Sequence, residues 1–202
     1  MEATEEIAAL KPSFISVTYG AGGGTSKNTV KIASHIQNDL GVASLAHLTC
    51  ASSTKEEVRQ VIEQLKEQGI QNILALRGDI PKDGAFPIPN HYKYASELIA
   101  DIKSQGDFCI GGACYPEGHP ESQTLEEDLI HLKEKVDAGC EFLTTQMFFD
   151  NNILYNFMYK ATKTWNRCSC RSRNYADHQR KPGKTEHCPV RKFGTAPFPC
   201  NR

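Results

Sequence analysis

The chain has 202 residues, 39% of them hydrophobic, and a formal net charge of −1 at pH 7. This length can bury one sizeable core, so we expect a single globular domain or a piece of a larger one. No apolar run is long enough to span a bilayer, and the acidic start MEATEEIAAL lacks the positive charge of a signal peptide. These features argue against a membrane protein and predict a cytoplasmic location.

Charge and cysteine content divide the chain into two parts. Residues 1–164 hold 14 Lys and Arg against 22 Asp and Glu, whereas residues 165–202 hold 9 against 2. The first part is therefore about −8 and the second about +7. Four cysteines are spread singly through the first part, where we expect small buried hydrophobes of a reduced protein: Cys50, Cys109, Cys114 and Cys140. The other four crowd into the tail.

Short apolar runs alternate with amphipathic segments along the first part. The runs predict strands at 14–20, 43–50, 72–79, 108–117 and 141–149. Their spacing of roughly 30 residues is that of a βα unit. Strands that alternate with helices predict an α/β fold with a parallel sheet.

The helices between these runs carry clear end signals. Two capping boxes are predicted, at Thr54 with Glu57 and at Thr124 with Glu127. Glycines are expected to end three helices, at Gly69, Gly106 and Gly139. The apolar stripes predicted to face the core are Val58, Val61, Ile62 and Leu65; Leu98, Ile99 and Ile102; and Leu129, Leu132 and Val136.

Polar residues gather at the carboxyl ends of the predicted strands. They are Thr18, Tyr19, His47, Thr49, Arg77, Asp79, Tyr115, Glu117, His119 and Gln146. Any one of them taken singly is more often a capping or turn residue. Polar residues at the carboxyl ends of five successive strands favour a ligand site at that edge of the sheet, where α/β proteins bind their ligands.

Two loops could carry the chemistry. In LALRGD, Arg77 and Asp79 flank Gly78, which would let backbone approach a ligand closely, although an ion pair that ties down the loop explains the pattern equally well. In CYPEGHPE, prolines hold an aromatic ring, a carboxylate and an imidazole in a polar loop suited to a ribose, a phosphate or a ring.

Other motifs carry less weight. GAGGGTS, at 20–26, lacks the spacing of a phosphate loop or a dinucleotide fingerprint, so a flexible loop explains it. No His, Cys and carboxylate cluster of the first part has zinc-ligand spacing, so we expect no metal there.

The motifs FISVTYGAGG, AHLTC, ILALRGD, YAS, YPEGHPE, DLIHLKEKVDAG and TTQMFFD, in this order, resemble the methylenetetrahydrofolate reductase family of bacterial type. The resemblance covers about residues 9–163. It implies a (β/α)₈ barrel that holds FAD at the carboxyl ends of its strands. It also implies hydride transfer from NAD(P)H through the flavin to methylenetetrahydrofolate, giving methyltetrahydrofolate for one-carbon metabolism and methionine supply, in a homo-oligomeric parent family.

The resemblance assigns roles to particular residues. The catalytic residues it implies are Asp79, Gln146 and Thr18: Asp79 would orient the folate and tune the flavin, Gln146 would hydrogen-bond the pterin or nicotinamide, and Thr18 would lie near the substrate. The FAD-binding residues it implies are Thr18, Tyr19, Ala21, His47, Arg77, Gly78, Asp79, Tyr94, Ala95, Tyr115, His119, Asp128 and Lys135. At His131 and Glu134 the bacterial relatives carry other polar residues, so the resemblance is weakest at the adenosine end.

The chain departs from the family pattern at its start. MEATEEIAALKPSF resembles the first barrel helix and the start of the second strand. The first strand, with the glutamate that serves the family as general acid, is therefore expected to be missing. Loss of a positioned acid would slow the folate half-reaction roughly 10²- to 10⁴-fold.

The second departure begins near Trp165, where KTWNRCSCRSRN replaces an expected strand. Dropping one base of the Trp165 codon permits Gly-Ile-Asp-Val-Pro-Val in the neighbouring frame, so residues 165–202 are predicted to be an out-of-frame, disordered tail. A zinc module is an alternative, as is a basic tail that binds nucleic acid, although neither matches a known module. The zinc candidates are Cys168, Cys170, His178, His187, Cys188 and Cys200.

The sequence thus predicts an incomplete TIM (β/α)₈ barrel of about five parallel βα units, followed by an irregular basic tail. Residues 1–164 are expected to form a partial FAD-binding reductase barrel. Its expected partners are FAD, NAD(P)H and methylenetetrahydrofolate, with no membrane and no nucleic acid. The competing hypothesis is an inactive product of a damaged gene.

Overall fold

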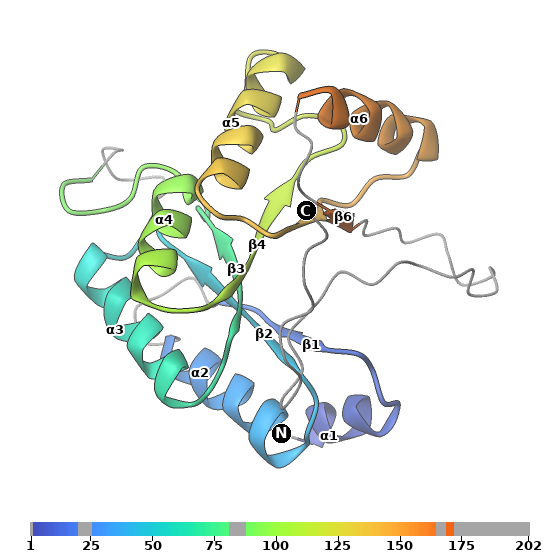
Figure 1. Cartoon of the computed structure of the whole chain (residues 1–202). Coiled ribbons are helices and arrows are strands. Elements are labelled where there is room, and N and C mark those ends of the chain that lie inside the picture. The colour runs from blue at the N-terminus through green and yellow to red at the C-terminus, as the bar shows by residue number, and fades with distance from the viewer. Residues whose placement is uncertain (1, 20–25, 81–87, 165–168, 172–202) are drawn as a thin grey trace.

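The computed structural model describes residues 2–19, 26–80, 88–164 and 169–171 (Figure 1). Its elements follow one another as α1 (Glu2–Ala9), β1 (Ile15–Val17), α2 (Ser26–Ser34), the π-helical turn η1 (His35–Asp39), β2 (Ser44–Thr49), α3 (Lys55–Glu67), β3 (Asn72–Leu76), α4 (Ala95–Gln105), β4 (Cys109–Cys114), α5 (Leu125–Asp137), β5 (Phe142–Thr145), α6 (Asn151–Thr164) and β6 (Ser169–Arg171). Among these described elements, no helix combines the length and apolar character needed to cross a membrane.

The six strands form one parallel sheet in chain order, β1-β2-β3-β4-β5-β6. Because the order never reverses, each crossover advances in the same direction, as in a barrel and unlike an open doubly wound sheet. Figure 1 shows the strands turning around a common axis, with α2 to α5 along one side. The predicted incomplete TIM barrel is confirmed.

The two faces of the sheet bury different side chains, because successive strand residues point to opposite sides. The face toward the helices carries the larger cluster, in which Leu48, Ile73 and Ile110 pack against the helix stripes. The inner face carries a smaller cluster of Leu45, Leu74, Cys109 and Phe142. The sheet therefore has an apolar layer on each side.

Gly111 allows the inner layer to close. A Cβ atom at this position would lie 2.4 Å from the ring of Phe142 and 3.0 Å from Leu74 Cδ1. Phe142 is 2% exposed and stands opposite Gly111 in the strand register. The ring occupies the space that any larger residue would need.

Most of the predicted helix signals are confirmed. Thr54 and Glu57 form a complete capping box at the start of α3, and its apolar stripe is buried, as is that of α4. In the second box only half is present: Thr124 accepts a hydrogen bond from the Glu127 N–H, but Glu127 accepts from the Gln123 N–H, one residue before the cap. In α5, Leu129 and Leu132 are buried and Val136 is only partly so.

The observed strands are shorter than the predicted runs at their carboxyl ends. Strand β3 ends at Leu76 and β4 at Cys114, so the residues that follow, Arg77 and Tyr115, begin loops. The polar side chains of Arg77 and Tyr115 therefore lie on loops and not in the hydrogen-bonded ladder.

One short piece of the predicted out-of-frame tail is described. Ser169–Arg171 forms β6, whose backbone pairs in parallel with β5. The rest of residues 165–202 lies outside the described part, where the prediction of disorder stays a prediction.

We predict that Gly111→Ala lowers the free energy of unfolding by about 1–3 kcal/mol, because the added methyl group collides with a buried ring. Urea denaturation of the unsubstituted chain and of Gly111→Ala measures this difference in the free energy of unfolding. Adding Gly111→Ala to a Phe142→Leu background should cost about 1 kcal/mol less than it does alone, since the closest collision, with the Phe142 ring, is gone. Equal costs in both backgrounds would contradict this account of the inner layer.

Candidate functional site

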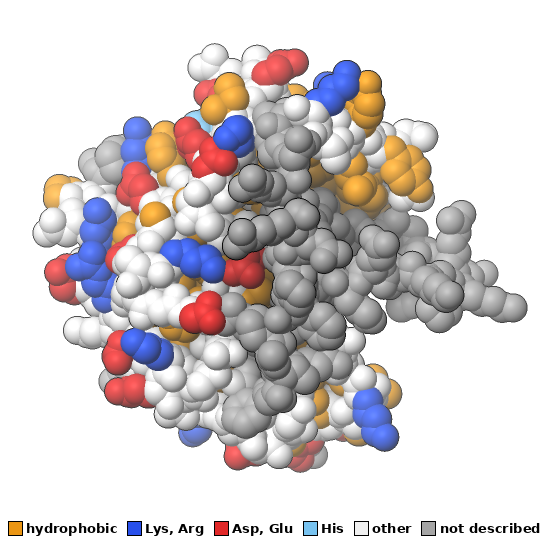
Figure 2. Space-filling model, viewed as in Figure 1, with side chains coloured by type: hydrophobic (Ala, Val, Ile, Leu, Met, Phe, Trp, Pro, Cys, Tyr) orange, Lys and Arg blue, Asp and Glu red, His pale blue; other side chains and the backbone are white. Residues whose placement is uncertain are grey.

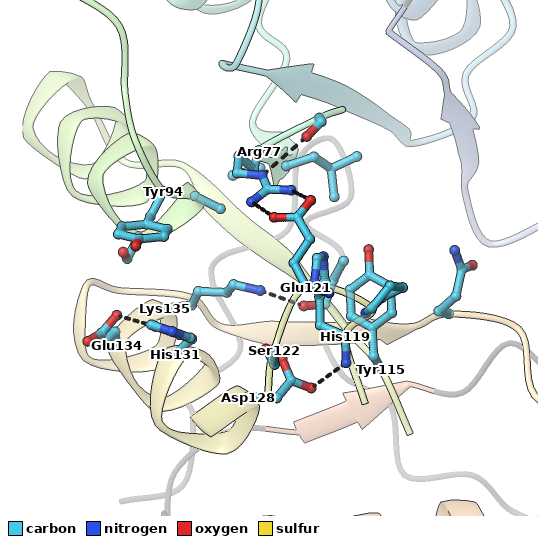
Figure 3. Close-up of a pocket in the computed structure, with 18 of the residues that line it drawn as sticks. Arg77, Tyr94, Tyr115, His119, Glu121, Ser122, Asp128, His131, Glu134 and Lys135 are labelled. Atoms are coloured by element: carbon cyan, nitrogen blue, oxygen red, sulfur yellow. Dashed lines mark hydrogen bonds and ion pairs between the residues drawn. The ribbon is translucent and has the colours of Figure 1, made fainter. Parts of the chain in front are cut away.

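A cavity of about 760 Å³ opens at the carboxyl ends of β3 and β4, beside the start of α4 and one face of α5. Figure 3 shows side chains from all of these elements pointing into it. Cavities of 300–1,000 Å³ bind small molecules and cofactors. Its place agrees with the ligand edge expected from the sequence.

The Arg-Gly-Asp turn forms one wall. Gly78 has a φ of +82°, and a Cβ atom there would lie 3.1 Å from Thr49 Cβ, so both conformation and space require glycine. The carbonyl of Arg77 accepts hydrogen bonds from the N–H groups of Cys50 and Ala51 at 3.1 and 2.8 Å. The backbone at Arg77 is therefore fixed to the loop that follows the neighbouring strand β2.

The Arg77 side chain makes a two-pronged ion pair with Glu121. Its Nη1 donates to Oε2 at 2.7 Å and its Nη2 to Oε1 at 2.5 Å. The hydrogen bonds that Arg77 donates to Glu121 raise the pKa of Arg77 and lower the pKa of Glu121. Both groups are charged at neutral pH.

The loop after β4 is held by two hydrogen bonds that converge on His119. The His119 N–H donates to Asp128 Oδ2 at 3.2 Å, and the Glu121 N–H donates to His119 Nδ1 at 3.1 Å. Nδ1 must therefore be unprotonated, and burial lowers the pKa of His119, which favours the neutral ring. Tyr115 stands edge-on to the same ring, with 4.6 Å between centroids.

Lys135 brings a second cation to the cavity floor. Its Nζ donates to the Ala113 carbonyl at 3.0 Å. Burial lowers the pKa of Lys135, an effect that the charge of Asp128 opposes. Burial likewise raises the pKa of Asp128, and the charge of Lys135 opposes it. The two groups stabilise each other's ionised form in a poorly solvated place.

Aromatic and acidic side chains line the end of the cavity away from Arg77. Tyr94 stacks on His131 with centroids 5.5 Å apart and an interplanar angle of 25°, and Lys93 Nζ lies 5.0 Å from the Tyr94 ring. His131 Nδ1 lies 3.3 Å from Glu134 Oε2. This end offers a flat surface and hydrogen-bond acceptors, unlike the cationic end at Arg77 and Lys135.

The cavity collects most of the residues named from the sequence. It is lined by Arg77, Gly78, Asp79, Tyr94, Ala95, Tyr115, His119, Asp128, Lys135 and Gln146. Three others do not line it. Thr18 is exposed after β1, Tyr19 packs against the helix-side core, and His47 is buried within β2. Ala21 lies outside the described residues.

In the sequence, His131 and Glu134 stand out only as departures from the family pattern, and nothing singles out Glu121 or Ser96, yet all four line the cavity. One signal was available: Asp128, His131 and Lys135 recur at i, i+3 and i+7, which places them on one face of α5. Glu121 gave no comparable signal, because its partner Arg77 lies 44 residues earlier.

Among the described residues, no three His, Cys, Asp or Glu side chains are grouped so that they could hold a metal ion. The side chains of the zinc candidates in the tail lie outside the described part.

Comparisons with known proteins give a consistent result. A family model described as methylenetetrahydrofolate reductase matches residues 1–170. A 5,10-methylenetetrahydrofolate reductase of Pectobacterium carotovorum is 40% identical over 160 residues, which cover 79% of this chain and 52% of the relative. Methylenetetrahydrofolate reductase (NADH) 1 of Arabidopsis thaliana is 37% identical, with 78% of this chain and 29% of the relative covered. The chain thus spans about half the length of the bacterial relative.

Solved structures extend the comparison to the fold alone. Phosphoenolpyruvate phosphomutase from Streptomyces platensis matches with a TM-score of 0.58 at 14% identity, over 86% of this chain and 72% of that one. At this identity the match supports the barrel architecture and nothing about chemistry.

We predict that Asp128→Asn makes Lys135 more reactive toward reductive methylation at pH 7.5, by roughly threefold or more. The carboxylate raises the pKa of Lys135 against the effect of burial, so its loss lowers that pKa and increases the neutral, nucleophilic fraction. Mass spectrometry of the Lys135 peptide, with exposed Lys66 as internal reference, measures the rate. Asp137→Asn, on the same helix and paired with Lys133, should change nothing. An unchanged or slower rate in Asp128→Asn would contradict the assigned electrostatics.

Proposed function

The chain belongs to the methylenetetrahydrofolate reductase family, and from this premise we propose that its cavity binds FAD for the NAD(P)H-dependent reduction of methylenetetrahydrofolate to methyltetrahydrofolate. The observation that carries the proposal is that two cations, Arg77 and Lys135, line one cavity at the carboxyl ends of parallel strands. We assign the FAD-binding unit to residues 1–164.

The residues present fit a flavin dinucleotide. Arg77 offers a planar fork suited to phosphate oxygens, and Lys135 offers a partly buried point charge, so together they can neutralise a diphosphate. The Tyr94 and His131 pair offers a flat surface at the opposite end, where the adenine ring would lie. Glu134, beside His131, can accept hydrogen bonds from ribose hydroxyl groups.

FAD supplies a ring that carries hydride between the nicotinamide and the folate. Asp79 and Gln146, both exposed and both in the cavity wall, would face these two substrates. The Asp79 carboxylate would accept hydrogen bonds from the pterin and orient it. The Gln146 amide can donate and accept at once, which suits the amide edges of a pterin or a nicotinamide. Thr18, exposed after β1, lies two strands away from β3 and would reach these substrates from outside the cavity wall.

We predict that the purified chain binds added FAD and that Arg77→Gln weakens this binding by roughly 10- to 100-fold, because a charged, bidentate donor to the diphosphate is lost. Quenching of flavin fluorescence gives the dissociation constants. Arg59→Gln serves as the matched control: Arg59 pairs with Asp101 and does not line the cavity, so its loss should leave the affinity within about twofold.

A chain that binds no FAD under these conditions would favour the competing hypothesis of an inactive product. Equal losses in the Arg77 and Arg59 variants would show a general charge effect and contradict the assignment of Arg77.

We further predict that NADH or NADPH bleaches the visible absorbance of the bound flavin under anaerobic conditions. Gln146→Ala should slow this reduction by roughly tenfold or more if its amide positions the nicotinamide. Stopped-flow absorbance measures the rate. Asn151→Ala, at the exposed start of α6, is the control and should leave the rate unchanged. Flavin reduction at equal rates in the unsubstituted chain, Gln146→Ala and Asn151→Ala would contradict the role given to Gln146.

A further inference from the structure

The Arg77 and Glu121 pair is an ion pair between two cavity-lining residues, and both Nη atoms of the guanidinium are used in it (Figure 3). A carboxylate and a phosphate present oxygens to a guanidinium in the same forked geometry. Glu121 therefore occupies the hydrogen-bonding positions on Arg77 that a phosphate group would need.

The two partners are held very differently. The Arg77 side chain is 18% exposed, its Nε donates to the Gly78 carbonyl at 3.3 Å, and its own carbonyl is fixed by Cys50 and Ala51. The Glu121 side chain is 51% exposed and lies at the solvent side of the pair. Rotation about its side-chain bonds can move the carboxylate into water while Arg77 stays in place.

We propose that Glu121 is an internal competitor for the anion site at Arg77, which a bound diphosphate must displace. This inference rests on the proposed function, since it concerns the regulation of the same site. It differs from the simpler idea that Glu121 only positions the guanidinium, because the Arg77 Nε already donates to the Gly78 carbonyl and the Arg77 backbone is held by Cys50 and Ala51.

The competition has a defined cost. If the guanidinium is open for only a fraction of the time, the apparent dissociation constant rises in inverse proportion to that fraction. A forked pair that is partly screened by solvent corresponds to an open fraction on the order of one tenth. Glu121 should therefore lower the affinity that Arg77 provides for anions at this site.

The test compares Glu121→Gln with the unsubstituted chain and with Glu117→Gln. Glutamine keeps a neutral acceptor beside Arg77, so the guanidinium retains a partner but loses the competing charge. Glu117 lies in the same loop and is exposed, and it does not line the cavity, so its replacement removes the same charge elsewhere. Calorimetry with FAD, ADP and inorganic pyrophosphate measures the three affinities.

We expect Glu121→Gln to bind all three probes about fivefold to tenfold more tightly, and Glu117→Gln to stay within about twofold. In an Arg77→Gln background the gain from Glu121→Gln should vanish, because the pair is already broken. A gain that persists there would overturn the proposal in favour of a general charge effect. Weaker binding in Glu121→Gln would overturn it in favour of a positioning role.

The design separates this inference from the proposed function. If the chain binds FAD and Glu121→Gln gains nothing, the inference fails and the flavin assignment stands. If pyrophosphate shows the gain while no protein binds FAD, competition at Arg77 stands and the flavin assignment fails. If none of the proteins binds any probe, both fail.

Discussion

All the strands that the structure describes pair in parallel, and both the helical layer and the site of the cavity follow from this. Strands that run in one direction must be joined by crossovers, and the helices that make them cover one face of the sheet. The same arrangement brings the carboxyl ends of all strands to one edge. There the ladder stops at Leu76 and Cys114, and the loops that follow carry the polar cavity. The inner face stays apolar, with Phe142 over Gly111 supporting the strands that hold those loops.

Within the cavity, burial and charge oppose each other. Desolvation alone would neutralise both Asp128 and Lys135, and each partly prevents this for the other. Arg77 is stabilised by Glu121, an acid on a different loop. The result is a site with a cationic end and an aromatic, acidic end, which suits a ligand that carries phosphates at one point and a ring with hydroxyl groups at another. Away from the cavity, Figure 2 shows hydrophobic side chains gathered over the region of α6, the helix that carries the exposed rings of Tyr155 and Tyr159.

Much of this could be predicted from the sequence, because it depends on local patterns. The capping box at Thr54, the buried stripes of α3 and α4 and the polar strand ends follow from spacings of a few residues. The rest depends on contacts between distant segments. Nothing near Glu121 indicates that it meets Arg77, and nothing near Thr124 shows that Glu127 reaches Gln123 instead of the cap. Thr18 and His47, like Arg77, are polar residues predicted near the carboxyl end of a strand, yet they lie outside the cavity wall. A shared edge of the sheet does not place every strand end in one pocket.

The proposed FAD site rests on one cavity that would hold a diphosphate between Arg77 and Lys135. The most direct measurement is a crystal structure of the full chain grown with FAD. We expect diphosphate oxygens within hydrogen-bonding distance of both cations, the adenine beside Tyr94 and His131, and the Glu121 carboxylate turned toward solvent. A flavin bound elsewhere on the molecule, or a diphosphate that contacts neither cation while Glu121 remains on Arg77, would contradict it.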